Sequence, residues 1–212
     1  MTVSAIVRPA AVLPLTWPQL GQLALDDQGL ADRPHGIGGS DANVILGGDP
    51  DRLRALWLEK RGEAVSPDLS AVLPVMLGCW TEAFNRQWFQ RVTALEVCRV
   101  GETVACERYD WRRCTLDGFI AEDDAVWEAK HTNAFSNADE GLARYMPQLQ
   151  HNMADTGAAR AFMSVIFGNH KYEMFEIASD WVYQIELLQA EVEFWDCVQT
   201  GREPVPAVPP AP

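Results

Sequence analysis

The chain has 212 residues, and 48% of them are hydrophobic, which is enough for the core of one ordinary globular domain. Its formal net charge of −13 at pH 7 argues against a protein that coats nucleic acid non-specifically, because phosphate contacts need lysine and arginine. The five cysteines are widely spaced without a CxxC pair, which argues against a zinc ribbon, an iron–sulfur cluster and a disulfide framework. No apolar run approaches about 18 residues and no signal peptide is recognisable, so we expect a soluble, cytoplasmic protein without membrane contact.

The charges are unevenly distributed along the chain. Residues 52–113 contain ten basic and eight acidic side chains, whereas residues 180–203 contain six acids and one base. A focused basic site is therefore compatible with the acidic composition. No linker divides the chain, so we predict a single domain over residues 1–202, followed by a proline-rich, solvated tail over 203–212.

The N-terminal half is expected to be mainly helical. Helices are predicted over residues 16–26, 41–46, 51–61 and 75–91. The second helix follows a glycine-rich turn, where Ser40 and Asp41 favour a helix start. The fourth helix is amphipathic, with an apolar stripe that we expect to face the core: Leu77, Trp80, Phe84 and Trp88.

The second half of the chain alternates between strand and helix patterns. Short strands are expected as an antiparallel meander over residues 95–100, 103–109, 111–120 and 125–130. A helix is predicted over 148–157, because Pro147 suits a first helical position. A hairpin then turns at Gly168, and a final helix begins at Ser179 or Asp180. This order predicts an α/β fold with a central mixed β-sheet flanked by helices.

Two neighbouring segments carry the residue types of a metal-dependent hydrolytic site. Side chains alternate along a strand, so Glu128 and Lys130 share one face. If the two strands pair through the turn at 122–124, Asp117 and Glu128 converge on one cation. With the backbone carbonyl of Ala129 and water, they form an oxygen site suited to Mg²⁺ or Mn²⁺, which can activate water for phosphoryl transfer. Lys130 then places a positive charge beside the developing phosphorane.

The same residue types also occur on exposed hairpins, and a solvated surface hairpin is the alternative. The apolar neighbours Phe119, Ile120, Val126 and Trp127 favour the functional interpretation. They indicate a buried strand pair, in which an acid without a partner is costly.

Five blocks of the sequence carry a more specific pattern. They are Gly36-Ile-Gly-Gly-Ser-Asp-Ala42, Leu77-Gly-Cys-Trp-Thr-Glu-Ala83, Leu116-Asp-Gly118, Glu128-Ala-Lys130 and Tyr145-Met-Pro-Gln-Leu-Gln-His151. With these blocks in this order, residues 33–157 resemble the YqaJ viral recombinase and phage lambda exonuclease family of PD-(D/E)XK nucleases. Five blocks in the family's order are hard to obtain by chance.

The resemblance implies a restriction-endonuclease-like core and a Mg²⁺-dependent double-strand DNA exonuclease working in the 5′ to 3′ direction. The implied products are 3′ single-stranded tails for phage-type recombination by strand annealing. The implied partners are double-stranded DNA ends, other copies of the chain in a trimeric ring, and a single-strand annealing protein. The implied setting is the cytoplasm of a bacterial host, with a phage or prophage origin.

The resemblance also assigns roles at the candidate metal site. Asp117, Glu128 and the carbonyl of Ala129 would bind the metal, and Lys130 would be catalytic. Glu82 would support the metal shell from the preceding helix. In place of the class's nominal proline, a leucine stands before the metal aspartate.

Polar residues of the family that hold DNA match a further set in this chain: Arg33, Ser40, Thr115, Gln148 and Gln150. The first four align with positions that hold a terminal 5′-phosphate, and guanidinium, hydroxyl and amide groups suit phosphate oxygens. Thr115 stands where serine is common, and Ser40 has a second interpretation as a helix cap only. Pro147 leaves open which of the two glutamines faces the site.

Two other functions stay open at this stage. The first is another nuclease on the same fold, a restriction endonuclease or a Cas4-like enzyme, although the chain lacks the Cas4 cysteine cluster and has the glycine-rich block. The second is a catalytically decayed DNA-end-binding scaffold, against which the intact Asp117, Glu128 and Lys130 argue. His131 and His151 flank the site blocks and are interpreted as structural or exposed.

Overall fold

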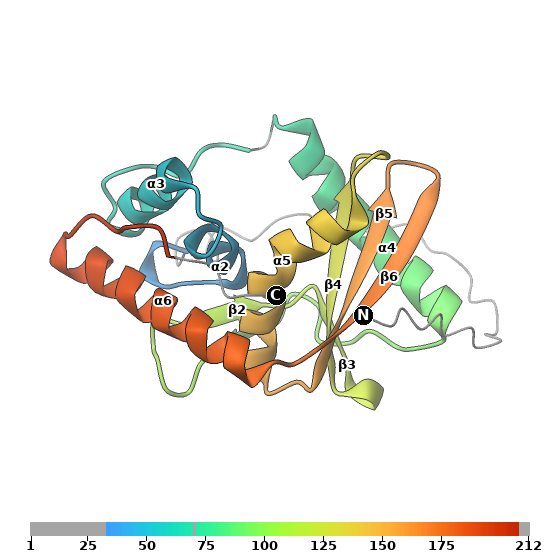
Figure 1. Cartoon of the computed structure of the whole chain (residues 1–212). Helices are drawn as coiled ribbons and strands as arrows, with labels where there is room; N and C mark the ends of the chain where they lie inside the picture. Colours follow the sequence, from blue (N-terminus) through green and yellow to red (C-terminus); the bar gives the residue numbers. More distant parts are fainter. Residues whose placement is uncertain (1–32, 70, 208–212) are drawn as a thin grey trace.

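The computed structural model describes residues 33–69 and 71–207, so the helix predicted over 16–26 lies outside the described residues. A four-stranded mixed sheet forms the centre, in the order β3-β4-β5-β6. Its strands are β3 (Gly118–Ile120), β4 (Ala125–Thr132), β5 (Arg160–Phe167) and β6 (Lys171–Ala178). β4 and β5 run parallel, whereas β3–β4 and β5–β6 are antiparallel (Figure 1). The predicted mixed sheet and the predicted hairpin of β5 and β6 are confirmed.

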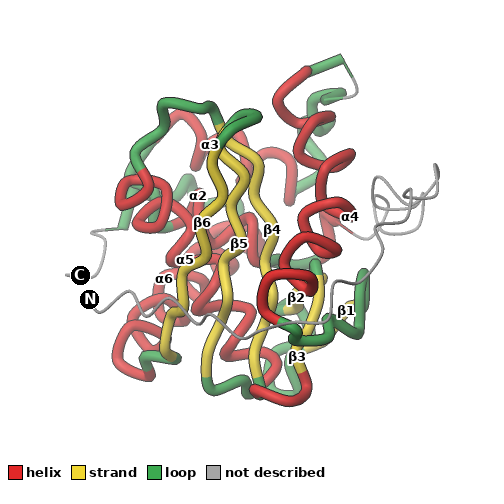
Figure 2. Tube along the Cα trace, turned by 90° about the vertical axis from the view of Figure 1, so that its right-hand side faces the viewer, coloured by secondary structure: helices red, strands yellow, loops and turns green. Residues whose placement is uncertain are grey.

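Helices cover both faces of this sheet (Figure 2). They are α2 (Gly39–Ile45), α3 (Pro50–Lys60), α4 (Leu73–Thr93), α5 (Ala138–Thr156) and α6 (Trp181–Thr200), with the short 3-10 helices η1 (Arg33–His35) and η2 (Ala121–Asp123). α4 packs on one face, and α5 packs on the other, where α2 and α6 contact it. A membrane-spanning helix is absent from the described part of the chain, since none of its helices combines the required length and apolar character.

The burial of β4 on both faces fixes the direction of its side chains. Val126 packs in the cluster that contains Leu149 of α5, whereas Trp127 packs in the cluster that contains Phe89 of α4. A strand that is covered on both faces needs apolar residues at consecutive positions, as β4 has in its first half. Because side chains alternate along a strand, Glu128 points to the same side as Val126, toward α5.

The predicted antiparallel meander is only partly correct. A separate two-stranded antiparallel sheet is formed by β1 (Thr103–Ala105) and β2 (Arg113–Thr115). Residues 95–100 contribute one isolated bridge, between Cys98 and Phe119, in place of the expected strand. The strand expected over 111–120 is divided into β2 and β3, because the chain leaves one sheet and enters the other between them.

Helix α5 begins well before its predicted start. Oδ1 of Asn137 accepts the backbone N–H groups of Asp139 and Glu140 at 2.9 and 3.5 Å, so the helix is capped there and starts at Ala138. Pro147 therefore lies inside the helix and not at its first position. Proline lacks an N–H and its ring crowds the preceding turn, so the helix is weakened there without ending.

Two expectations about helix caps have different outcomes. The N-cap of α2 is Gly38, so the interpretation of Ser40 as the cap is wrong, and Oδ2 of Asp41 accepts the N–H of Gly38 at 2.9 Å. The N-cap of α6 is Asp180, one of the two predicted residues, and its Oδ1 accepts the N–H of Val182 at 2.9 Å.

Most of the apolar stripe on α4 faces outward, which contradicts the prediction, and only Trp88 of the four residues is half-buried, beside Tyr172. Leu77, Trp80 and Phe84 are 40%, 45% and 42% exposed, whereas Asn85 and Phe89 on another side of the helix are buried. Helical spacing shows that residues share a face, but α4 has apolar side chains on two faces, and only the packing against β4 and β5 decides which one is covered.

Candidate active site

The pairing of β3 with β4 brings Asp117 and Glu128 to opposite positions. The antiparallel register pairs Gly118 with Trp127, so Asp117, one residue before β3, lies across from Glu128. Oδ2 of Asp117 accepts the backbone N–H of Ala129 at 2.9 Å, which holds its side chain against β4. The predicted pairing of these two segments is confirmed.

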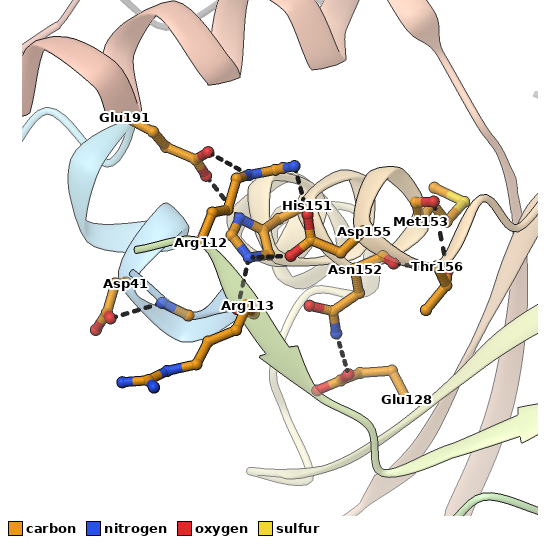
Figure 3. A network of polar contacts seen from close by, with 11 residues as sticks. Asp41, Arg112, Arg113, Glu128, His151, Asn152, Met153, Asp155, Thr156 and Glu191 are labelled. Atoms are coloured by element: carbon orange, nitrogen blue, oxygen red, sulfur yellow. Dashed lines mark hydrogen bonds and ion pairs between the residues drawn. The ribbon is translucent and has the colours of Figure 1, made fainter. Parts of the chain in front are cut away.

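Three donors surround the carboxylate of Glu128. Its Oε1 accepts hydrogen bonds from Nζ of Lys130 and from Nε2 of Gln148, both at 2.6 Å. Its Oε2 accepts from Nδ2 of Asn152 at 3.5 Å (Figure 3). Because Glu128 is only 1% exposed, these donors replace the water that an ionised carboxylate would otherwise need.

Helix α2 sets the position of Gln148. Nδ2 of Asn43 donates to Oε1 of Gln148 at 3.1 Å, and the backbone N–H of Gln148 donates to Oδ1 of Asn43 at 3.0 Å. The N–H of Gln148 follows directly after Pro147, where the helix is weakened, and its acceptor on Asn43 lies outside α5.

The close approach of α2 to α5 depends on a glycine. A Cβ atom on Gly39 would clash with Oδ1 of Asn152, so the glycine permits this approach.

Acidic side chains crowd together at this end of the sheet, where burial and mutual repulsion oppose their ionisation. Burial and then the charge of Asp117 raise the pKa of Glu128 to about 8. The same two causes raise the pKa of Glu82, on α4, to about 7. Burial lowers the pKa of Lys130, but the charges of Glu128 and Asp117 outweigh burial and raise it, so the ammonium stays charged. A bound cation reduces the repulsion between buried carboxylates and favours their ionised form.

The donor set suits a hard divalent cation that keeps much of its water. Among residues 33–69 and 71–207, no group of three or more His, Cys, Asp or Glu side chains is placed to hold a metal ion. Asp117 and Glu128 provide two carboxylates on facing strands. Mg²⁺ is commonly bound by one or two carboxylates, with water and substrate oxygens completing its shell. The residues present therefore fit such an ion.

Replacing Glu82 by glutamine is expected to stabilise the metal-free protein at pH 8. The pKa of Glu82 is raised to about 7, so its contribution to stability is present below its ordinary value near 4.5 and is lost as pH rises through 7. A neutral amide avoids this loss, and the free energy of unfolding should rise by roughly 1–3 kcal/mol at pH 8 and change little at pH 5. Urea denaturation at both pH values measures the effect, with the exposed Glu96→Gln as control. If the free energy of unfolding changes equally at both pH values, the charge of Glu82 is not the cause of the change.

The residues predicted to hold a terminal phosphate lie around the glycine-rich loop. Arg33 is in η1, its side chain is 38% exposed, and its Nε lies 3.1 Å from Oε1 of Glu59. Ser40 is exposed in the first turn of α2, and Thr115 is exposed at the end of β2. The loop before α2 hydrogen-bonds to the start of β2, which brings these two segments side by side.

The two glutamines of the last block point in different directions. Gln148 faces Glu128, as described above, whereas Nε2 of Gln150 donates to the carbonyl of Ala178 at 3.0 Å. Oε1 of Gln150 accepts the N–H of Asp180 at 3.0 Å, so Gln150 joins α5 to the start of α6. Of the two glutamines, Gln148 is therefore the one that faces the candidate metal site.

Three residues of the site are not predicted from the sequence. Asn152 lies four residues after Gln148 and therefore shares its helix face, a spacing that could have found it. Tyr145 lies three residues before Gln148, and the centre of its ring is 4.6 Å from Nζ of Lys130. Asn43 gives no such signal, because it meets Gln148 only through the packing of α2 on α5.

The comparisons with known proteins agree with this architecture. A family model described as the YqaJ-like viral recombinase domain matches residues 30–159. An uncharacterised protein YqaJ of Bacillus subtilis (strain 168) is 30% identical over 187 residues, which cover 84% of this chain. The chain spans 58% of the length of that relative.

Solved structures share the fold. An LHK-Exo structure in complex with dAMP has a TM-score of 0.68 at 17% identity, covering 81% of this chain and 92% of that chain. The alkaline exonuclease LHK-Exo from Laribacter hongkongensis has a TM-score of 0.65 at 16% identity, with the same coverage of 81% and 92%. A phage-related exonuclease from Haemophilus somnus 129PT has a TM-score of 0.60 at 11% identity, covering 78% and 92%. The chain therefore belongs to the YqaJ-like viral recombinase family, and its central mixed sheet with flanking helices is the fold of these exonucleases.

Proposed function

We propose that this protein is a Mg²⁺-dependent deoxyribonuclease that degrades linear double-stranded DNA from its 5′ ends. The observation that carries the proposal is the convergence of Asp117, Glu128 and Lys130 on one end of the β3–β4 pair. Membership in a viral recombinase family and a fold shared with exonucleases support DNA as the substrate. The alternatives, an endonuclease and a decayed DNA-end-binding scaffold, are less well supported, because the family is one of recombinases and all three side chains are in place.

Each residue of the site is assigned a role in this proposal. Asp117, Glu128 and the carbonyl of Ala129 would hold Mg²⁺, for which Mn²⁺ can substitute, and Glu82 would support the metal from α4. When bound, the ion polarises the scissile phosphate and lowers the pKa of water. Lys130 places its ammonium beside Glu128, where it stabilises negative charge that develops on the phosphate.

Gln148 is proposed to orient the two charged residues of β4. Its Nε2 donates to Glu128, and its Oε1 lies 3.4 Å from Nζ of Lys130. One amide thus contacts both side chains and restricts the angle between them. An amide suits this position because its donor and its acceptor lie on opposite branches of one rigid group.

The cation requirement provides the experiment that tests this function. Mg²⁺ or Mn²⁺ is expected to support digestion of linear duplex DNA, whereas Ca²⁺ should permit DNA binding with cleavage reduced by about 10²-fold or more. An all-oxygen site accepts Ca²⁺, but the looser coordination of this ion places the attacking water poorly. Release of acid-soluble nucleotides measures cleavage, and a gel-shift assay measures binding. Undiminished digestion in EDTA would contradict the proposed mechanism.

We also propose that the end of the DNA is recognised through its 5′-phosphate. Arg33 supplies the main charge, and Ser40 and Thr115 supply hydroxyl groups from the adjoining loop and strand. Gln148 is shared with the metal site. Because Arg33 is paired with Glu59, the phosphate must compete with this carboxylate, which favours a dianionic terminal phosphate over an internal monoanionic one.

Arg33→Ala is expected to slow digestion of 5′-phosphorylated duplex about tenfold more than digestion of 5′-hydroxyl duplex. Arg33→Lys should restore only part of this preference, because a lysine lacks the planar fork of the guanidinium. Initial rates on the two substrates measure the effect at one fixed salt concentration, since phosphate contacts weaken as salt rises. Arg54→Ala is the control, because Arg54 is an exposed arginine that also pairs with a glutamate. Equal slowing of both substrates by Arg33→Ala would make Arg33 a general contact and remove the end-recognition role.

The proposed biological role is the production of 3′ single-stranded tails for phage-type recombination by strand annealing. Degradation of one strand from each 5′ end leaves the complementary strand single-stranded, and such a strand is the substrate of an annealing protein. We propose a trimeric ring that encloses the duplex, with a single-strand annealing protein as its partner. Analytical ultracentrifugation tests the oligomeric state directly.

A further inference from the structure

A closed group of four ionisable side chains lies behind the candidate active site (Figure 3). Arg112 precedes β2, His151 and Asp155 lie one turn apart on α5, and Glu191 comes from α6. Nε of Arg112 lies 2.8 Å from Oε2 of Glu191, and its Nη1 lies 2.5 Å from Oδ1 of Asp155. Nδ1 of His151 lies 2.6 Å from Oε1 of Glu191. All four side chains are at most 5% exposed.

Both ring nitrogens of His151 face acceptors. Nδ1 faces the carboxylate of Glu191, and Nε2 lies 3.0 Å from the backbone carbonyl of Arg113 and 3.2 Å from Oδ2 of Asp155. A neutral imidazole has a single N–H and could donate on one side only. The imidazolium donates on both sides, and it balances the charges, because Arg112 and His151 then offset Asp155 and Glu191.

This group joins the elements that carry the candidate site. His151 lies on α5 between Gln148 and Asn152, which both donate to Glu128. Its hydrogen bond to the carbonyl of Arg113 reaches β2, shortly before the chain arrives at Asp117. A shift of α5 against β2 would therefore change how the amides of Gln148 and Asn152 meet the carboxylate of Glu128.

We propose that His151 is a positioning residue whose imidazolium, together with Arg112, Asp155 and Glu191, holds α5 against β2 and α6. The position of α5 in turn aligns the side-chain amides of Gln148 and Asn152 on Glu128. The effect of His151 on turnover rests on the proposed function. The charge state of His151 and the alignment of the two amides do not, because both exist in the protein without metal or DNA.

The electrostatics of the group agree with this role. Burial lowers the pKa of His151, but Glu191 and Asp155 outweigh burial and raise it to about 10. The groups that face the ring are Glu191 from α6, Asp155 from α5 and the carbonyl of Arg113 from β2, with Arg112 behind the two carboxylates. The contribution of His151 to stability is fully present below its ordinary pKa of 6.5, declines as pH rises, and is lost through pH 10.

Nuclear magnetic resonance of the ¹⁵N-labelled protein tests the charge state. The chain has four histidines, and the His151 signals are identified by their loss in His151→Gln. At pH 8 both ring nitrogens of His151 should be protonated, whereas an exposed histidine is neutral at this pH. The side-chain amide signals of Gln148 and Asn152 should shift with the same midpoint when His151 loses its proton. A neutral His151 at pH 8, or amide signals that ignore its titration, would overturn the proposal.

Charge-restoring variants separate positioning from simple destabilisation. His151→Gln leaves one uncompensated negative charge, and His151→Gln with Glu191→Gln restores neutrality. The single variant should lower kcat for DNA hydrolysis about tenfold or more while KM changes less than about twofold, and the double variant should recover part of kcat. Val198→Ala is the control. Val198 lies on α6 in a hydrophobic cluster that contains none of the four ionisable side chains, so this variant loses stability while the four charges stay in place.

The outcomes distinguish this role from the proposed function. Failure of the wild-type protein to hydrolyse DNA contradicts the proposed function, while the magnetic resonance result still decides the role of His151. If kcat of His151→Gln equals that of Val198→Ala at equal stability, the four charges are structural only. If the single variant does not fold, the double variant and the wild-type titration carry the test.

Discussion

Asp117→Ala, Glu128→Ala and Lys130→Ala are each expected to reduce Mg²⁺-dependent DNA hydrolysis by about 10³-fold or more, with the fold retained. Asp117 and Glu128 lie across from each other on the β3–β4 pair, so each strand supplies one carboxylate to the proposed metal site. If one carboxylate is removed, the other cannot also fill its position. Lys130 is 2.6 Å from Glu128, and no other lysine or arginine is hydrogen-bonded to this carboxylate among the described residues. Initial rates on linear duplex at saturating Mg²⁺ measure the effect.

Two controls make this result specific. Lys171→Ala removes an exposed lysine from β6, at the far edge of the same sheet, and should leave the rate unchanged. Circular dichroism and thermal unfolding check that each variant is folded, which matters most for Glu128, because its loss leaves Lys130 and Gln148 without their shared acceptor. Near-normal turnover in any of the three folded variants would remove that residue from the catalytic group.

Arg112→Ala is expected to produce the largest loss of stability, about 3–5 kcal/mol in the free energy of unfolding. Its guanidinium joins Glu191 and Asp155, whose side chains are fully buried. Removing it leaves two carboxylates with His151 as their sole remaining cationic partner in the described group, and a buried charge without a partner is expensive. Chemical denaturation at pH 7 measures the loss.

The matched control is Arg108→Ala, which removes an exposed arginine from the loop before Arg112, where its guanidinium lies over the ring of Tyr109. An exposed substitution of this kind changes stability by about 0.5 kcal/mol or less. If Arg112→Ala and Arg108→Ala have the same small effect, the buried group is not held together by its charges.

The central part of the site can be predicted from the sequence because it depends on local rules. Asp117 and Glu128 meet through a tight connection between adjacent strands, and such a pairing follows from strand alternation and one turn. Glu128 and Lys130 share a face for the same reason. The mixed sheet follows from the order of strands and helices, and the predicted fold class is confirmed.

The errors concern the start of one helix and the buried face of another. The sequence favours Pro147 as the start of a helix, but the Asn137 cap and the contact of α5 with α2 carry the helix through it. The spacing of Trp80 and Phe84 favours a stripe in the core, but the sheet covers another face of α4, which contains Phe89. The face of α4 that the sheet covers is not encoded in the spacing of its residues, whereas the Asn137 cap is a local signal that the sequence contains.

The availability of the basic residues to DNA also depends on tertiary packing. Their number between residues 52 and 113 allows a local basic surface, but Lys60 and Arg112 of this set are buried in ion pairs with Asp41 and with Glu191. Their charge balances acids inside the protein and is not available to DNA.

The sequence leaves open whether His151 is structural or exposed. In the structure it is fully buried, and its partners come from α6 and β2, which are distant in the sequence.

The direction of digestion is measured on a linear duplex that carries a label at either its 5′ or its 3′ ends. With Mg²⁺, the 5′ label should be released early as small products, while the 3′ label stays in long single strands and a covalently closed circle stays intact. Lys130→Ala should release neither label. Cleavage of the closed circle, early release of the 3′ label, or equal digestion by Lys130→Ala would contradict the account of a 5′ to 3′ exonuclease that works through Asp117, Glu128 and Lys130.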